Sequence, residues 1–265
     1  ERLNIAGDII RIDIDSKKLS DYYPAKVGLV ADAKSACSAI LEALGPAKVR
    51  QSNVNTRVME LRKTISLNLS PSESRHKNFL DILRKVAAED TIFSGDACQL
   101  VYTGSFAFPV SGPRQWFYPA GFCALGNALP NGIGAKLAQP DVPVVVLAGD
   151  GGFMFNVQEL SSAVAHGIDV VCIVFTDNAY GNVKRFQKEG YGGRHIGVDL
   201  HNPDFAKMAE TFGMPGLYAN GPDALRSALD ESMNSSGPTL IEVPIGEVPN
   251  TWSLVKRPSS AGNKN

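Results

Sequence analysis

The sequence predicts an α/β fold in which a doubly wound, mostly parallel sheet carries helices on both faces. From residue 76 onward, short apolar segments alternate with helical segments, which is typical of this class. Two of the apolar segments, Val142–Ala148 and Val170–Thr176, are almost continuous runs. Such runs indicate central strands that are covered on both faces, because a strand with one exposed face alternates apolar and polar residues.

The first 44 residues contain signals for one strand and one helix. The segment Ile9–Ile14 alternates apolar and charged residues, as a half-buried strand does. Asp32 precedes an alanine- and leucine-rich helical segment, and Gly45 and Pro46 follow it as a stop. One strand and one helix cannot bury a sheet, so we interpret residues 1–44 as the C-terminal remnant of a preceding domain. The alternative is a crossover that packs on the next domain.

Residues 45–75 are polar and mixed, and we interpret them as a linker with one short helix. The next domain then covers residues 76–265. Its predicted helices lie near 76–89, 97–106, 124–138, 156–167, 203–213 and 222–235. Its predicted strands lie at 91–94, 142–148, 170–176, 216–219 and 239–243. We expect His76 and His201 at surface or capping positions, whereas His195 lies in a glycine-rich loop that could approach a substrate.

Composition restricts the class of function. Lys and Arg (26) nearly balance Asp and Glu (27), which removes the long-range electrostatic case for nucleic acid or an anionic membrane as the main partner. No run of about 18 apolar residues is present, so nothing in the sequence predicts a bilayer span. The four cysteines lie far apart without a CxxC pair, which argues against a disulfide framework and favours a reducing cytosol. The chain begins with Glu1 and has no signal peptide, so we expect a fragment or a processed product.

Acidic residues follow both central strands. The first strand leads into Gly149-Asp150-Gly151-Gly152, and the second leads into a turn from Asp177 to Gly181. Ligands of doubly wound sheets bind at the carboxyl ends of the strands, and glycines let backbone N–H groups face a phosphate. Mg²⁺ takes one or two carboxylates together with phosphate oxygens and water. Each motif alone is more often a turn or a helix cap, whereas the two carboxylates at adjacent strand ends could together hold a metal beside a diphosphate.

Other phosphate-binding motifs do not fit. The sequence contains no GxxxxGK[ST], and the segment that starts at Gly149 lacks the third glycine of a dinucleotide fingerprint. The segment GDGGFMFNVQELSSAVAHGIDVVCIVFTDNAYGNV instead resembles thiamine-diphosphate enzymes of the acetolactate synthase, pyruvate oxidase and benzoylformate decarboxylase group. WFYPAGFCALGNALPNGIGAKLA resembles their loop and helix that hold the aminopyrimidine, and SGDACQLVY resembles a strand-end loop beside the active site.

The resemblance runs from about residue 5 to about residue 250. It implies that residues 1–44 end a central domain and that residues 76–265 form the thiamine-diphosphate-binding fold. Asp150 and Asp177 then match the side-chain Mg²⁺ ligands, and Ala179 matches a ligand that uses its backbone carbonyl. Further residues that match cofactor contacts are Cys123 through its carbonyl, Leu125 as the wedge that bends the cofactor, Gly149, Gly151, Gly152, Asn178, Tyr180 and Gly181. Gln99 and Phe186 match residues near the substrate.

The resemblance also implies a decarboxylase or carboligase, a lyase or transferase that uses thiamine diphosphate and Mg²⁺ on a small-molecule 2-oxo acid. FAD is a further cofactor that the full enzyme could carry. Family members are homodimers or homotetramers, and we expect a cytoplasmic location. A Glu from a pyrimidine-binding domain of the partner subunit activates the cofactor, and Glu73, Glu89 and Glu159 lie in the wrong segments for that role. We therefore expect this chain to be inactive alone.

Three positions depart from the family pattern. Asp177 stands where most relatives have Asn, so we expect poor cofactor binding without metal. Leu100 replaces a His, and Phe186 replaces a Trp, of acetolactate synthases. These differences leave open a decarboxylase of a larger 2-oxo acid that performs no carboligation. Two hypotheses from different classes also stay open, namely a non-catalytic binding or regulatory module with this fold and a plain nucleotide-binding α/β protein.

Overall fold

The computed structural model describes residues 5, 7–21, 23–46 and 53–246. Parts of the predicted linker and the end of the predicted second domain lie outside these residues. The chain divides into two compact units, and the division falls between Met59 and Glu60.

The smaller unit contains two parallel strands and a helix. Strand β1 (Ile10–Asp13) pairs in parallel with β2 (Val27–Val30), and the short 3₁₀ helix η1 (Ser16–Ser20) lies between them in sequence. Helix α1 (Ala33–Leu44) has the bounds that the sequence predicts. It begins where predicted because the Asp32 carboxylate accepts a hydrogen bond from the Ser35 backbone N–H at 3.1 Å.

Two helices occupy the segment around the predicted linker. Helix α2 (Val54–Leu67) spans the division between the units, and α3 (Pro71–Val86) starts earlier than the predicted residue 76. A capping box sets this start, since Glu73 N–H donates to Ser70 Oγ at 3.3 Å and Ser70 N–H donates to Glu73 Oε2 at 2.7 Å.

The expectation that His76 lies at the surface is wrong. Because α3 begins at Pro71, its apolar face turns His76 toward the core, where only 2% of the residue is exposed. His76 Nδ1 lies 3.0 Å from Thr103 Oγ1. Burial, with a smaller contribution from Arg75, lowers the pKa of His76 to about 4, so the ring is neutral at pH 7.

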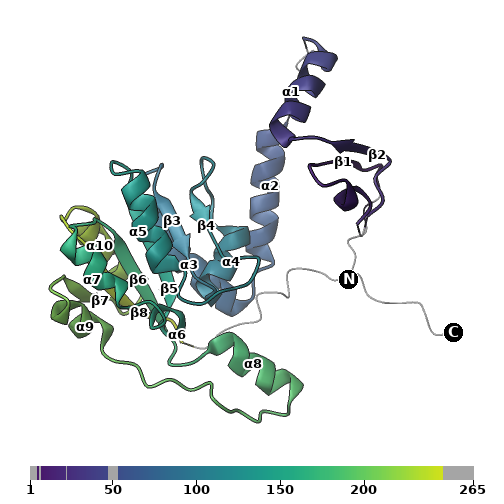
Figure 1. Ribbon diagram of the computed structural model, residues 1–265. Helices are drawn as coiled ribbons and strands as arrows, with labels where there is room; N and C mark the ends of the chain where they lie inside the picture. Colours follow the sequence, from purple (N-terminus) through teal and green to yellow (C-terminus); the bar gives the residue numbers. More distant parts are fainter. Residues whose placement is uncertain (1–4, 6, 22, 47–52, 247–265) are drawn as a thin grey trace. The chain divides into compact units, whose positions relative to one another are not determined.

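The larger unit is built on one parallel sheet, which confirms the predicted fold class (Figure 1). Among the described residues its six strands run in the order β4-β3-β5-β6-β8-β7, and every neighbouring pair is parallel. The strands are β3 (Ile92–Gly95), β4 (Trp116–Phe117), β5 (Val144–Gly149), β6 (Val171–Thr176), β7 (Gly216–Tyr218) and β8 (Thr239–Pro244). Strand β4 was not predicted, because two residues carry no detectable periodicity.

A separate apolar core lies on each face of this sheet. Successive residues of β5 face opposite sides, so Val145 and Leu147 belong to one core while Val146 and Ala148 belong to the other. The first core is covered by α3 and α10, and the second by α5, α7 and α9. The bounds of these helices are α5 (Ala128–Ala138), α7 (Glu159–Ala165), α9 (Phe205–Thr211) and α10 (Pro222–Met233). The continuous apolar runs of β5 and β6 therefore fill both cores, as predicted.

Three further helices begin at the carboxyl ends of neighbouring strands. Helix α4 (Gln99–Ala107) follows β3, α6 (Asp150–Phe153) follows β5, and α8 (Gly181–Gly190) follows β6. Since β3, β5 and β6 are adjacent and parallel, the loops before these helices meet at one edge of the sheet.

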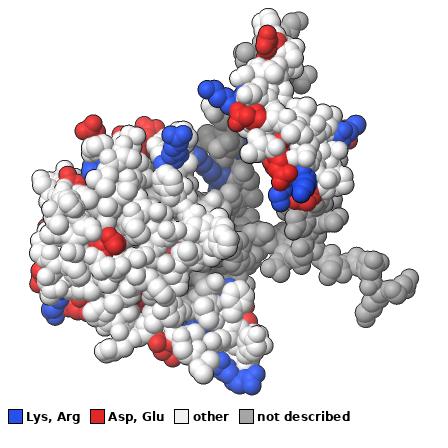
Figure 2. Space-filling model, in the orientation of Figure 1, with Lys and Arg blue, Asp and Glu red and all other residues white. Residues whose placement is uncertain are grey.

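Surface properties agree with the near-neutral composition. The face in Figure 2 shows scattered acidic and basic side chains with no continuous patch of either sign. Within the part of the chain that the structure describes, no helix combines the length and apolar character that crossing a bilayer requires.

Candidate functional site

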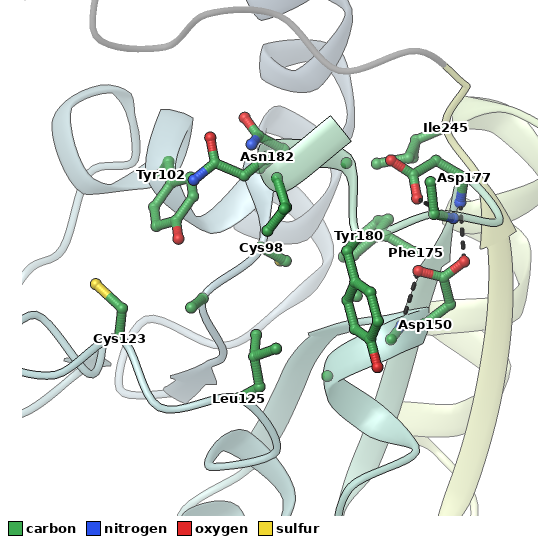
Figure 3. A pocket seen from close by; sticks show the side chains of 18 residues that line it. Cys98, Tyr102, Cys123, Leu125, Asp150, Phe175, Asp177, Tyr180, Asn182 and Ile245 are labelled. Carbon is green, nitrogen blue, oxygen red and sulfur yellow. Dashed lines mark hydrogen bonds between the residues drawn. The ribbon is translucent and has the colours of Figure 1, made fainter. Parts of the chain in front are cut away.

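A cavity of about 220 Å³ opens at the carboxyl ends of β3, β5 and β6. Most of the residues predicted as site residues line it, namely Gln99, Cys123, Leu125, Gly149, Asp150, Gly151, Gly152, Asp177, Ala179, Tyr180 and Gly181. Figure 3 shows the acidic pair on one side of the cavity and the loop that carries Cys123 and Leu125 on the other. Two predicted residues, Asn178 and Phe186, do not line it.

Asp150 is the most deeply buried of the acidic residues in this cavity, with 2% of its surface exposed. It begins α6 directly after β5, so its position follows from the end of the strand. Its Oδ1 accepts a hydrogen bond from Gly151 N–H at 2.8 Å. Its Oδ2 accepts from Asn178 N–H at 2.8 Å and from Asp177 N–H at 3.3 Å. Backbone donors therefore hold a buried carboxylate in one orientation.

Asp177 supplies a second carboxylate at the end of the adjacent strand β6. Its Oδ1 accepts a hydrogen bond from Ala179 N–H at 3.1 Å. Burial, together with a smaller contribution from the nearby Asp150 carboxylate, raises the pKa of Asp177 to about 7, although the hydrogen bond from Ala179 N–H and the Lys184 cation both act to lower it. Two carboxylates that are withdrawn from solvent and repel each other are stabilised when a cation binds beside them.

The glycines of the loop after β5 lie where a side chain would collide with its neighbours. A Cβ atom on Gly151 would lie 2.6 Å from the Tyr180 ring, and one on Gly152 would lie 2.4 Å from Asp96 Oδ2. Close packing against Tyr180 and Asp96 therefore requires glycine at both positions, and the two glycines line the cavity with backbone alone.

Asp96 is a residue of this site that the sequence reasoning missed. It follows β3 and is buried, which raises the pKa of its carboxyl group. Its Oδ2 accepts a hydrogen bond from Gly126 N–H at 2.8 Å, and Asn156 Nδ2 donates to the Gly126 carbonyl at 2.8 Å. These bonds fasten the loop that carries Cys123 and Leu125 to the end of β3 and to the segment between α6 and α7. A usable signal was present, since Asp96 is an acidic residue directly after a predicted strand.

The two residues of that loop differ in backbone and exposure. Cys123 has a φ of 49°, in the left-handed region that non-glycine residues rarely occupy, and its Sγ lies 3.7 Å from Tyr118 Oη. Leu125 is 39% exposed, so this apolar side chain faces the cavity instead of a core. An apolar side chain left uncovered beside a cavity is suited to pack against a bound ring.

The substrate candidates lie in different surroundings. Gln99 is 5% exposed and lines the cavity, and its Oε1 has no hydrogen-bond partner among the described residues. Leu100 is completely buried in the core and does not line the cavity. Phe186 is half exposed on α8, where the Arg185 guanidinium lies 4.6 Å from its ring centre. His195 borders a second, adjoining cavity of about 630 Å³ that also includes Asp177.

Asn202 is the other residue that the sequence reasoning missed. Its side-chain amide donates to Asp150 Oδ2 at 2.7 Å and to Asn178 Oδ1 at 3.0 Å. Asn202 lies 52 residues after Asp150, and no local pattern marks it. Among the described residues no three His, Cys, Asp or Glu side chains gather into a possible metal site. A metal here would therefore have two side-chain carboxylates, with backbone, ligand or water oxygens completing its coordination.

Comparison with known proteins agrees with this geometry. Residues 96–243, more than half of the chain, match the family described as "Thiamine pyrophosphate enzyme, C-terminal TPP binding domain". The chain belongs to this family. The matched region starts at Asp96 and ends in β8, so it contains the cavity-lining loops after β3, β5 and β6.

Relatives of this thiamine pyrophosphate enzyme domain include decarboxylases and synthases. The chain is 38% identical over 246 residues to a "Probable 2-ketoarginine decarboxylase" of Pseudomonas aeruginosa, which covers 92% of this chain and 44% of the relative. It is 29% identical over 233 residues to an acetolactate synthase large subunit of Haemophilus influenzae, covering 85% of this chain and 41% of that protein. An acetolactate synthase of Bacillus subtilis is 43% identical over 125 residues, 47% of this chain and 22% of that enzyme. The chain thus spans less than half the length of these relatives.

Proposed function

We propose that the cavity binds thiamine diphosphate together with Mg²⁺. The side chains of Asp150 and Asp177 and the backbone carbonyl of Ala179 would hold the metal, and Gly151 and Gly152 would receive the diphosphate. The observation that carries this proposal is the pair of carboxylates at adjacent strand ends, one almost completely buried and the other with its pKa raised to about 7. Such a pair favours a bound cation, and the glycine backbone that lines the cavity beside it suits an anion.

Other cavity residues fit the same cofactor. Gln99 Oε1, which is buried and has no hydrogen-bond partner in the part of the chain that the structure describes, would accept a hydrogen bond from a group bound in the cavity. Leu125 would pack against the cofactor where its two rings are joined, and the Cys123 carbonyl would accept a hydrogen bond from the aminopyrimidine. Burial raises the pKa of the Cys98 thiol in the cavity wall to about 12, so this group is neutral and acts only as an apolar contact. Tyr180 and Gly181 complete the diphosphate end, while Asn178 would act through the turn that it forms.

The proposed reaction is the decarboxylation of a 2-oxo acid. When bound, thiamine diphosphate would supply an electron sink, its thiazolium ring, for the electron pair of the carbon–carbon bond that breaks when CO₂ leaves. The chain's own residues would bind the diphosphate, orient the rings and provide a cavity with an apolar wall. The relative with 38% identity across 92% of the chain is named as a decarboxylase of 2-ketoarginine, which favours a 2-oxo acid with a long side chain.

Carboligation, in which the substrate carbon that has lost CO₂ would form a bond to a second carbonyl compound instead of taking up a proton, is the second candidate. The 43% identity to an acetolactate synthase over 125 residues favours it. Leu100, which stands in place of a His of acetolactate synthases, does not distinguish the two reactions by touching the substrate. It is completely buried and does not line the cavity.

We further propose that catalysis requires a pyrimidine-binding domain from outside these 265 residues, within a cytoplasmic homodimer or homotetramer. Several apolar side chains of the loops around the cavity are exposed, as a surface covered by another domain would be. They are Phe122, Leu125, Met154 and Phe155, and Phe122 is 98% exposed. That domain would supply the activating Glu, and the complete enzyme could carry FAD elsewhere.

A calorimetric titration of the purified chain tests the binding proposal. We expect thiamine diphosphate to bind with Mg²⁺ present and to lose most of its affinity in EDTA, while ATP and NAD fail to compete. Asp150→Ala should abolish binding, and Asp141→Ala, which lies away from the cavity, should leave it unchanged. Absence of binding to the wild-type chain would overturn the proposal.

CO₂ release by the complete enzyme over a panel of 2-oxo acids tests the proposed reaction. Binding of thiamine diphosphate without any turnover would favour a regulatory module.

A further inference from the structure

A polar side chain from outside the loop after β5 and the turn after β6 contacts the buried Asp150 carboxylate. Asn202 lies just before α9, and its Nδ2 is 2.7 Å from Asp150 Oδ2 and 3.0 Å from Asn178 Oδ1. A carboxylate oxygen accepts hydrogen bonds only, so the Asn202 atom that faces it is the amide nitrogen. The same amide group therefore joins the loop after β5 to the turn after β6.

Hydrogen bonds make the two oxygens of Asp150 unequal. Three N–H groups surround Oδ2, from Asp177, Asn178 and Asn202. Among the described residues, Oδ1 accepts one hydrogen bond, from Gly151. Because an oxygen with three donors has no lone pair left for a metal ion, Oδ1 is the oxygen that can coordinate one. Asn202 supplies the third of these donors and thereby reinforces this choice of oxygen.

Asn202 is itself held in place from both sides. Before it, the backbone of Val198–Leu200 pairs antiparallel with the turn, since Tyr180 N–H donates to the Val198 carbonyl at 2.8 Å and Leu200 N–H donates to the Asn178 carbonyl at 2.9 Å. After it, Phe205 is completely buried and stacks edge-on against Phe153 of α6, with ring centres 5.9 Å apart. The amide is thus oriented before any ligand binds.

We propose that Asn202 is a positioning residue for the metal centre, and this inference rests on the proposed Mg²⁺ and thiamine diphosphate site. It orients the Asp150 carboxylate through Oδ2, and it stabilises the strained turn at Asn178, whose φ is 56°. A neutral amide suits this role, because a cation at the same place would compete with the metal for the carboxylate. Residues that orient metal ligands typically change metal affinity about 10- to 100-fold when they are removed.

The test uses Mn²⁺ as a spectroscopic substitute for Mg²⁺, followed by electron paramagnetic resonance in the presence of thiamine diphosphate. Asn202→Ala removes the donor, and Asn202→Leu removes it while keeping a similar volume. We expect both variants to bind Mn²⁺ about 10-fold or more weakly than the wild type. Saturating metal should restore the wild-type affinity for thiamine diphosphate, because the diphosphate contacts remain. Asn234→Ala is the matched control, since Asn234 also uses its amide as a donor but binds the Asp230 carbonyl of α10, away from the cavity.

The outcomes separate this inference from the proposed function. If the wild-type chain binds no Mn²⁺ with thiamine diphosphate, the proposed site itself is wrong and the inference falls with it. If the wild type binds and both Asn202 variants bind Mn²⁺ within twofold of it, Asn202 has no positioning role and the proposed site stands. Circular dichroism verifies that each variant is folded, and the Leu variant guards against collapse of the loop in the Ala variant.

Discussion

The backbone N–H of Asp177 lies 3.3 Å from Oδ2 of Asp150, so the ends of two neighbouring strands are joined through an acidic side chain. This contact brings a second carboxylate close to the first. It explains why the Asp150 charge helps to raise the pKa of Asp177, after burial as the main cause. A metal ion would relieve this repulsion, and a proton on Asp177 relieves it when metal is absent.

Metal-dependent cofactor binding should therefore depend on pH. Because the pKa of Asp177 is about 7 without metal, a proton must leave this carboxyl group before it can bind Mg²⁺ below pH 7. We expect the Mg²⁺ affinity to fall by about tenfold for each pH unit below 7. Titrations of Mg²⁺ between pH 5.5 and 8 at a fixed thiamine diphosphate concentration measure this. Asp177→Asn is the control, and an affinity of the wild type that stays constant with pH would contradict the prediction.

Asp177→Asn should also strengthen the binding of thiamine diphosphate in the absence of metal. Above its pKa of about 7 the Asp177 carboxylate is negatively charged, and this charge repels the diphosphate when no cation is bound. In EDTA we expect very weak binding of thiamine diphosphate by the wild type and tighter binding by Asp177→Asn. Calorimetry in EDTA measures both affinities. Tight binding by the wild type in EDTA would show that the Asp177 charge does not repel the cofactor.

Gly152→Ala should destabilise the protein and loosen the loop that carries Leu125. The new Cβ would lie 2.4 Å from Asp96 Oδ2, the oxygen that accepts the hydrogen bond from Gly126. Overpacking of this kind costs about 1–3 kcal/mol in the free energy of unfolding. Urea denaturation measures the change. Gly134→Ala is the matched control because nothing lies within 4 Å of its Cβ, and an alanine in this helix should be neutral or stabilising by up to about 1 kcal/mol.

Buried His76 should make the protein sensitive to acid. Its pKa is about 4 in the folded state against the ordinary 6.5, so the unfolded chain carries more protons between these values. Stability from this residue is complete above pH 6.5 and is lost as the pH falls toward 4, by at most about 3 kcal/mol. His76→Asn, which can still bond Thr103, should remove this part of the pH dependence of unfolding. His201→Asn, at an exposed position, should leave the profile unchanged, and identical profiles for the wild type and His76→Asn would refute the assignment.

Much of the fold could be predicted because its signals are local. The apolar runs of β5 and β6 and the Asp32 cap of α1 each depend on residues close together in sequence. Prediction failed where the signal was weak or not local. Strand β4 has two residues, α8 has no buried residue among those described, and the exposure of His76 depended on where α3 began.

The sequence by itself determined that Asp150 and Asp177 follow two central parallel strands, and hence that they lie at one edge of the sheet. That inference holds because parallel strands bring their carboxyl ends together whatever the loops between them do. Only the tertiary structure decided how these groups are held. Asp96 binds a loop 30 residues away, and Asn202 reaches Asp150 across 52 residues. A hydrogen bond between such distant residues depends on the packing of whole helices and strands, which no local sequence pattern records.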